Sequence, residues 1–143
     1  MARYLVVANL TLVGEHLLDA LRERARRGRT EIYVVVPAAP DPASWRSRAH
    51  EEDLRQARQR LETALERFRA LGSQVEVDGE VGDARPPEAI GDVLREHPPF
   101  DELILSTLPP GPSRWLGMDL PRRIERAFDV PMTHVVAQPE QVS

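Results

Sequence analysis

The sequence contains no cysteine and no lysine among its 143 residues. Without cysteine, disulfide bonds, thiol catalysis and zinc–thiolate sites are excluded. Without lysine, Schiff-base chemistry and the phosphate-binding lysine of a Walker-type loop are excluded as well. The 19 basic residues are therefore all arginine. The chemistry left to the chain is that of arginine, histidine, carboxylates, hydroxyls and the backbone.

Long apolar runs and an excess of basic charge are also missing. No stretch reaches the ~18 apolar residues of a membrane span, and the start of the chain has no signal-peptide pattern, so we expect a cytoplasmic protein. The net charge is -4 and the pI is about 5.6, whereas proteins that bind nucleic acid usually carry an excess of basic residues on one face. The expected partners therefore include neither nucleic acid nor membrane. The length and the 41% hydrophobic content fit one domain over residues 1–143.

Short apolar runs alternate with helical patterns along the chain. Tyr4–Ala8 and Glu31–Val36 are continuous and rich in β-branched residues, as in strands buried on both faces. The alternating run Gln74–Val81 indicates an edge strand. Amphipathic patterns separate these runs, and the longest predicts a helix over about Ser44–Leu71. Two further strands are expected, at Glu102–Leu105 and Val130–Val136.

This alternation predicts an α/β fold, with a five-stranded parallel sheet between two layers of helices in a Rossmann-like three-layer sandwich. If the chain starts in the centre of the sheet and winds both ways, the strand order is 3-2-1-4-5. In such sheets ligands bind beyond the carboxyl ends of the strands, where the strand order reverses. Strands one and four would meet at that point.

Polar residues follow both of these strands. We expect them to form a small ligand pocket, closed on one side by the end of the second strand. The alternative is that these side chains only hold the loops together. The residues concerned are Asn9, Thr11, Val36, Ser106 and Thr107.

The segment Ser106–Pro121 has the position of a phosphate-binding loop. Three of its residues, Pro109, Pro110 and Pro112, have no backbone N–H to donate to a phosphate. Gly111 is a flexible point between them, and Ser113 and Arg114 are the groups that could contact an anion.

The element order resembles that of the universal stress protein family. Two local signatures add to the resemblance: Gly82-Asp83 before the third helix and Phe128–Pro131 before the last strand. The resemblance runs from Tyr4 to Val136. It implies the adenine-nucleotide-hydrolase-like fold, a role in stress response and a homodimer formed through the last strand. The residues near the two-fold axis would be Met132, His134 and Val136.

Family members that bind ATP carry Gly-x-x-Gly, nine further residues, and then Gly followed by Ser or Thr. Counting back from Pro131 places these glycines at positions occupied by Leu105, Leu108 and Met118, and the hydroxyl residue at Asp119. A carboxylate at the start of a helix would also repel a phosphate. With these glycines missing, the resemblance implies a universal-stress-protein-like, non-catalytic ligand-sensing or signalling protein with a small-molecule ligand. The alternative is a nucleotide-binding protein or slow ATPase that holds ATP or AMP with magnesium in the same pocket.

Other catalytic and metal-binding patterns are missing from the sequence. The hydrolase elbow Gly-x-Ser-x-Gly does not occur, and the four histidines show no metal-ligand spacing to one another. We therefore expect no catalytic residue and no metal site.

Overall fold

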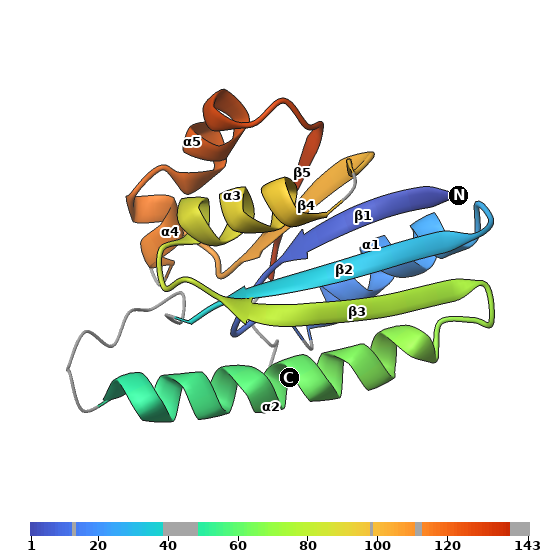
Figure 1. Ribbon diagram of the computed structural model, residues 1–143, viewed down its shortest axis with the longest axis horizontal. Helices are drawn as coiled ribbons and strands as arrows, with labels where there is room; N and C mark the ends of the chain where they lie inside the picture. Colours follow the sequence, from blue (N-terminus) through green and yellow to red (C-terminus); the bar gives the residue numbers. More distant parts are fainter. Residues whose placement is uncertain (13, 39–48, 98, 111–112, 138–143) are drawn as a thin grey trace, which may run out of the picture.

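The computed structural model describes residues 1–12, 14–38, 49–97, 99–110 and 113–137. These residues form a five-stranded sheet in the order β3-β2-β1-β4-β5, in which every neighbouring pair is parallel (Figure 1). The α/β class and the strand order predicted from the sequence are confirmed. The strands are β1 (Ala2–Val7), β2 (Thr30–Pro37), β3 (Val75–Gly82), β4 (Glu102–Thr107) and β5 (Met132–Val136). The helices are α1 (Glu15–Ala25), α2 (Ala49–Arg69), α3 (Pro86–Glu96), α4 (Arg114–Gly117) and α5 (Leu120–Ala127).

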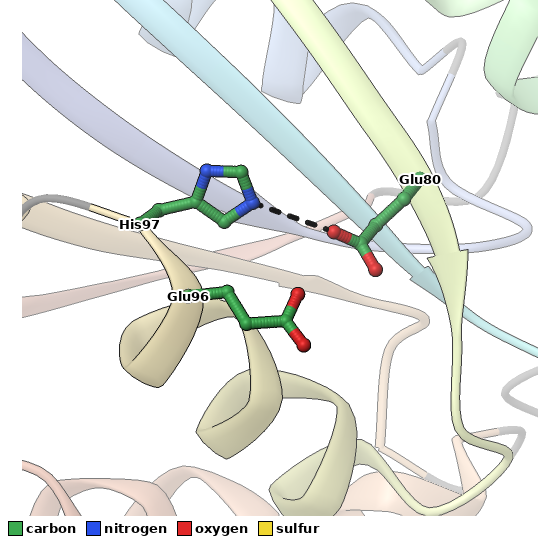
Figure 2. A group of neighbouring side chains, drawn as sticks. All are labelled: Glu80, Glu96 and His97. Atoms are coloured by element: carbon green, nitrogen blue, oxygen red, sulfur yellow. Dashed lines mark ion pairs between the residues drawn. The ribbon is translucent and has the colours of Figure 1, made fainter.

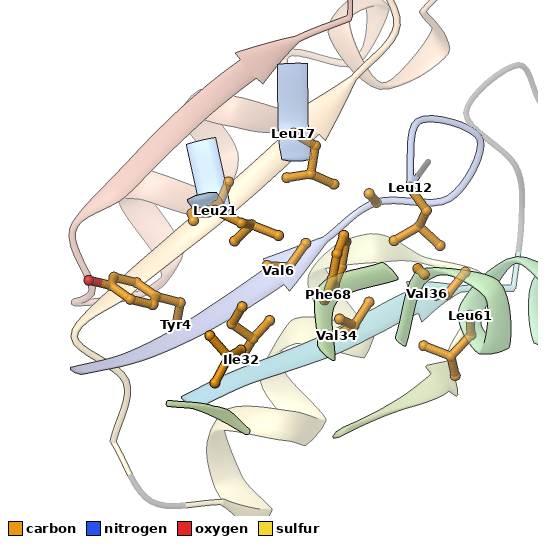
Figure 3. Packing of buried hydrophobic residues seen from close by; sticks show 14 of the residues in the cluster. Tyr4, Val6, Leu12, Leu17, Leu21, Ile32, Val34, Val36, Leu61 and Phe68 are labelled. Carbon is orange, nitrogen blue, oxygen red and sulfur yellow. The ribbon is translucent and has the colours of Figure 1, made fainter. Parts of the chain in front are cut away.

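Two hydrophobic clusters cover the two faces of the sheet. In one, α1 and α2 pack on strand residues such as Val6 and Val34, and Phe68 is contributed by α2 (Figure 3). In the other, α3, α4 and α5 pack on strand residues such as Leu5 and Val7, and Trp115 is contributed by α4. The molecule is therefore a three-layer sandwich, with its helices divided between the two faces.

The central strand β1 explains why its sequence is a continuous apolar run. Side chains alternate between the faces of a strand, so Leu5 and Val7 enter one cluster while Tyr4 and Val6 enter the other. Both faces are covered from Tyr4 to Val7, and all four of these residues are buried. The weaker alternation of β3 matches its place at the edge of the sheet.

Some element boundaries differ from the sequence-based prediction. β4 continues through Ser106 and Thr107, because Thr107 still pairs with Val136. β5 begins at Met132 rather than Val130, and α4 was not predicted. The predicted start of the longest helix at Ser44 lies outside the described residues. Among the helices that the structure describes, none is both long enough and apolar enough to cross a bilayer.

Candidate functional site

The carboxyl ends of β1 and β4 lie side by side in the centre of the sheet, and their polar residues meet there. The hydroxyl of Thr11 lies 2.7 Å from that of Ser106, although the two residues are 95 positions apart in the chain. Their residues are only 5% and 1% exposed, respectively. The structure thus brings together these two residues from the predicted pocket, and their hydroxyls are hydrogen-bonded to each other.

Asn9 uses both ends of its side-chain amide in the same region. Its Nδ2 donates to the carbonyl oxygen of Pro37 at 2.8 Å, which ties the loop after β1 to the end of β2. Its Oδ1 accepts a hydrogen bond from Arg60 Nη1, also at 2.8 Å. Asn9 is 1% exposed, so it is a buried polar group with its partners inside the protein.

Arg60 is a residue of this region that the sequence did not reveal. It lies on α2 and is half-buried, and its second terminal nitrogen donates to Gln56 at 3.3 Å. A helix arginine with other charged residues around it has no local signal that separates it from a solvated surface residue. Its contact with Asn9 across 51 positions places a permanent positive charge beside the carboxyl edge of β1.

Thr107 lies on the other side of β4 from Ser106, because successive side chains point to opposite faces. It is fully buried, and its hydroxyl donates to the carbonyl oxygen of Leu108 at 2.9 Å. The same hydroxyl lies 2.8 Å from Nε2 of His134 on β5. Thr107 therefore contacts an edge-strand residue and does not join the Thr11–Ser106 pair.

The loop after β4 uses its polar groups to fold on itself. The hydroxyl of Ser113 accepts a hydrogen bond from the Leu116 N–H at 3.1 Å, which caps α4, and the Ser113 N–H donates to the Pro109 carbonyl at 3.1 Å. Gly111 lies outside the described residues, and so does the side chain of Arg114. Of the anion-contacting groups expected in this loop, Ser113 is the one whose position the structure gives.

Asp119 precedes α5 in a left-handed conformation, with φ 54° and ψ 41°. It occupies the N-cap position, but its side chain makes no capping hydrogen bond. The left-handed conformation favours glycine. The count back from Pro131 placed the third glycine of the ATP-binding pattern one position earlier, at Met118.

The structure also gives the positions of Val36 and of the three residues expected at a dimer interface. Val36 is fully buried in the cluster beneath α1 and α2, so its side chain packs in the core. The three residues expected at a dimer interface lie on β5, which has β4 as its neighbour within the chain and is an edge strand. All three are half-buried: Met132, His134 and Val136.

A groove of about 340 Å³ is lined by residues of α1 and of the C-terminal end of α2. It is lined by Leu18, Arg22, Arg67, Ala70 and Leu71, and none of the expected ligand-binding residues is among them. Among the described residues, the polar side chains at the carboxyl edge of the sheet are hydrogen-bonded within the protein. They do not line this groove.

Comparison with known proteins shows which solved structures have a similar fold. A scan against protein-family models and a search of curated proteins found no match to this sequence. Among solved structures, a universal stress protein from Archaeoglobus fulgidus superimposes with a TM-score of 0.63 at 18% identity, over 94% of this chain and 93% of that one. A hypothetical protein matches with a TM-score of 0.48 at 16% identity, over 97% of each chain. The strand order, the helix layers and the near-complete overlap with the first of these structures show that the chain has the universal stress protein fold.

Proposed function

We propose that this protein is a universal-stress-protein-like ligand-sensing or signalling protein that acts in stress response without catalysing a reaction. The observation that carries the proposal is the hydrogen-bonded pair of Thr11 and Ser106 at the carboxyl edge of the central strands. In a fold of this class ligands bind at that edge. Here its hydroxyls are buried and already paired.

The loop after β4 supports the absence of ATP turnover. A phosphate is held by several converging backbone N–H groups. Pro109 and Pro110 supply none, and the Ser113 N–H is already used by the Pro109 carbonyl. A ligand that fits this edge would be small and would exchange hydrogen bonds with Thr11 and Ser106, since these hydroxyls both donate and accept.

A nucleotide-binding version of the same site is the second candidate, and Arg60 is the observation that favours it. The guanidinium lies 2.8 Å from Asn9 Oδ1, at the edge where a nucleotide would bind. Arginine suits phosphate because its planar group offers several N–H donors. In this version Arg60 would leave Asn9 and pair with phosphate oxygens of ATP or AMP.

The deciding experiment is a calorimetric titration of the purified protein with Mg-ATP and with AMP, after mass spectrometry has shown that no nucleotide is carried over. We expect no heat of binding at micromolar nucleotide and no phosphate release. Saturable micromolar binding of either nucleotide would overturn the non-nucleotide proposal.

Arg60→Ala and Arg58→Ala form a matched pair for that experiment, because Arg58 is an exposed residue of the same helix. If nucleotide binds, the second candidate requires the loss of binding in Arg60→Ala and its retention in Arg58→Ala. If nucleotide does not bind, a thermal-shift screen of small metabolites on the wild type and on Thr11→Val locates the ligand. A stabilising compound should lose its effect in that variant.

We also propose that the protein is a homodimer joined through the outer edge of β5. The edge position of this strand supports the proposal, because an unpaired strand edge readily pairs with a second chain.

A further inference from the structure

A second group of titratable side chains lies on the sheet face covered by α3, apart from the carboxyl edge. It consists of Glu80 on β3 together with Glu96 and His97 at the end of α3 (Figure 2). Each side chain offers one ligand atom, and these atoms lie within 4.8 Å of one another. No local sequence pattern indicates this group, because Glu80 is 17 positions from His97.

The fold brings these residues together through the register of the sheet. Tyr33 on β2 is paired with Asp78 on β3, so Glu80, two residues further on, points to the same face. The helix α3 starts after β3 and runs back across that face. Its C-cap residue, His97, donates its N–H to the Val93 carbonyl at 3.0 Å, which fixes the backbone from which the imidazole projects.

Tyr33 positions two members of the group. Its hydroxyl donates to Glu80 Oε1 at 2.6 Å, and its ring lies 4.3 Å from the imidazole of His97, centroid to centroid. Burial, followed by the hydrogen bond to Glu80, raises the pKa of the Tyr33 hydroxyl. His97 Nε2 lies 3.6 Å from the same Glu80 oxygen.

The electrostatics of the group favour a cation. The two carboxylates, of Glu80 and Glu96, carry two negative charges. The C-terminal end of α3 adds the partial negative charge of a helix terminus. A hydrogen bond that holds a ligating carboxylate in place is a common feature of metal sites, and Tyr33 supplies one to Glu80.

We propose that Glu80, Glu96 and His97 form a binding site for a divalent transition-metal cation of the zinc type. Zinc accepts imidazole nitrogen and carboxylate oxygen together, and a site with three protein ligands leaves a fourth position for water. Magnesium and calcium prefer oxygen ligands alone. Tetrahedral bonds of about 2.0–2.1 Å bring ligand atoms to about 3.3 Å from one another. In the structure the ligand atoms lie within 4.8 Å of one another. Rotation of the exposed Glu96 side chain would bring its carboxylate closer to the other two ligand atoms.

The test is a calorimetric titration of the full, chelator-treated protein with Zn²⁺. We expect one site with a Kd below about 100 µM. His97→Ala, Glu80→Gln and Glu96→Gln should each weaken it at least about tenfold, and Tyr33→Phe, which only releases Glu80, should weaken it several-fold. Two variants serve as controls, because both residues are exposed and lie outside the group: Glu88→Gln on the same helix and His16→Ala.

Visible absorption of the Co²⁺-loaded protein gives a second readout, since the ligand-field bands depend on the number and type of ligands. Glu96 is exposed, so Glu96→Gln keeps the fold, and its spectrum separates loss of a ligand from loss of structure. The proposal is overturned if Zn²⁺ does not bind, if binding survives His97→Ala unchanged, or if Mg²⁺ and Ca²⁺ bind as tightly as Zn²⁺. The site uses none of the residues of the carboxyl edge, so its outcome is independent of the proposed function.

Discussion

At the scale of single residues, Asn9 connects the loop after β1 to β2 and to α2 through one buried amide. It bonds the end of β2 through the Pro37 carbonyl and α2 through Arg60. Asn9→Ala removes both bonds and leaves a buried carbonyl without its donor. We expect the free energy of unfolding to fall by about 1–3 kcal/mol, measured by urea denaturation.

Gln56→Ala is the control for this prediction. It removes the other side-chain partner of Arg60 at 3.3 Å without touching Asn9, and we expect an effect within about 0.5 kcal/mol. Equal stability of Asn9→Ala and the wild type would show that Pro37 and Arg60 find other partners.

Asp119 provides a second prediction at this scale. It holds a left-handed conformation without a side-chain capping bond, so its side chain gains little there. A residue with Cβ is strained in this region, and glycine is not. We expect Asp119→Gly to be more stable than Asp119→Ala by about 1 kcal/mol in denaturant unfolding. Identical stabilities would mean that the backbone relaxes at this position.

At the scale of elements, a polar network joins α1, β4 and β5. Glu102 accepts hydrogen bonds from Arg24 Nε at 2.8 Å and Nη2 at 2.7 Å, and a third from the hydroxyl of Thr133. The hydrogen bonds from Arg24 lower the pKa of the Glu102 carboxyl, while burial acts in the opposite direction. Both side chains of the ion pair are mostly covered, at 11% and 17% exposed.

Because the folded-state pKa of Glu102 lies below its unfolded value, the carboxylate stabilises the protein above the ordinary glutamate pKa. This contribution disappears as the pH falls through the folded pKa. We expect Glu102→Gln to cost about 1–3 kcal/mol near neutral pH and to flatten the acid side of the stability profile, measured by denaturant melts at several pH values. Asp19→Asn, in an exposed pair with Arg22, should change little. A parallel acid profile in Glu102→Gln and the wild type would assign the acid sensitivity to other groups.

The edge strand β5 carries the prediction about assembly. The Ala137 N–H donates to Thr107, so the odd-numbered N–H groups of this strand point towards β4 and the even-numbered ones point outwards. Val136→Pro removes an outward N–H and should convert the proposed dimer to a monomer in light scattering, with the internal pairing kept. Val136→Thr keeps the N–H and the β-branched shape, and should remain dimeric. A dimer that survives Val136→Pro would place the interface elsewhere.

At the scale of the whole molecule, the strand order followed from the sequence because buried parallel strands are continuous apolar runs. Tyr4–Ala8 and Ile32–Val36 are such runs, and they lie in β1, the central strand, and in its neighbour β2. The meeting of Thr11 with Ser106 followed from that order. What the order could not predict is that the two hydroxyls bond each other, since this depends on side-chain positions within a few tenths of an ångström.

The features of the site that could not be predicted from the sequence are contacts between elements that are distant in the chain. Arg60 reaches Asn9 from the charged face of a helix, and Glu80 meets His97 across a strand and a helix end. Neither contact has a local pattern. The four residues of α4 follow a proline-rich stretch and are too few for a helical period to be recognised.

The place of β1 in the sheet has a consequence for how the chain is made. Its first neighbour, β2, follows soon after it, whereas its second neighbour, β4, is held by contacts such as Arg3 to Asp101, 98 positions later. On the ribosome, the backbone N–H and C=O groups on one edge of β1 therefore stay unpaired while most of the protein is synthesised. Unpaired strand edges pair with other chains, and contacts between residues so distant in the chain form slowly. We therefore expect the chain to be most prone to aggregation before residues 102–107 emerge and pair with β1.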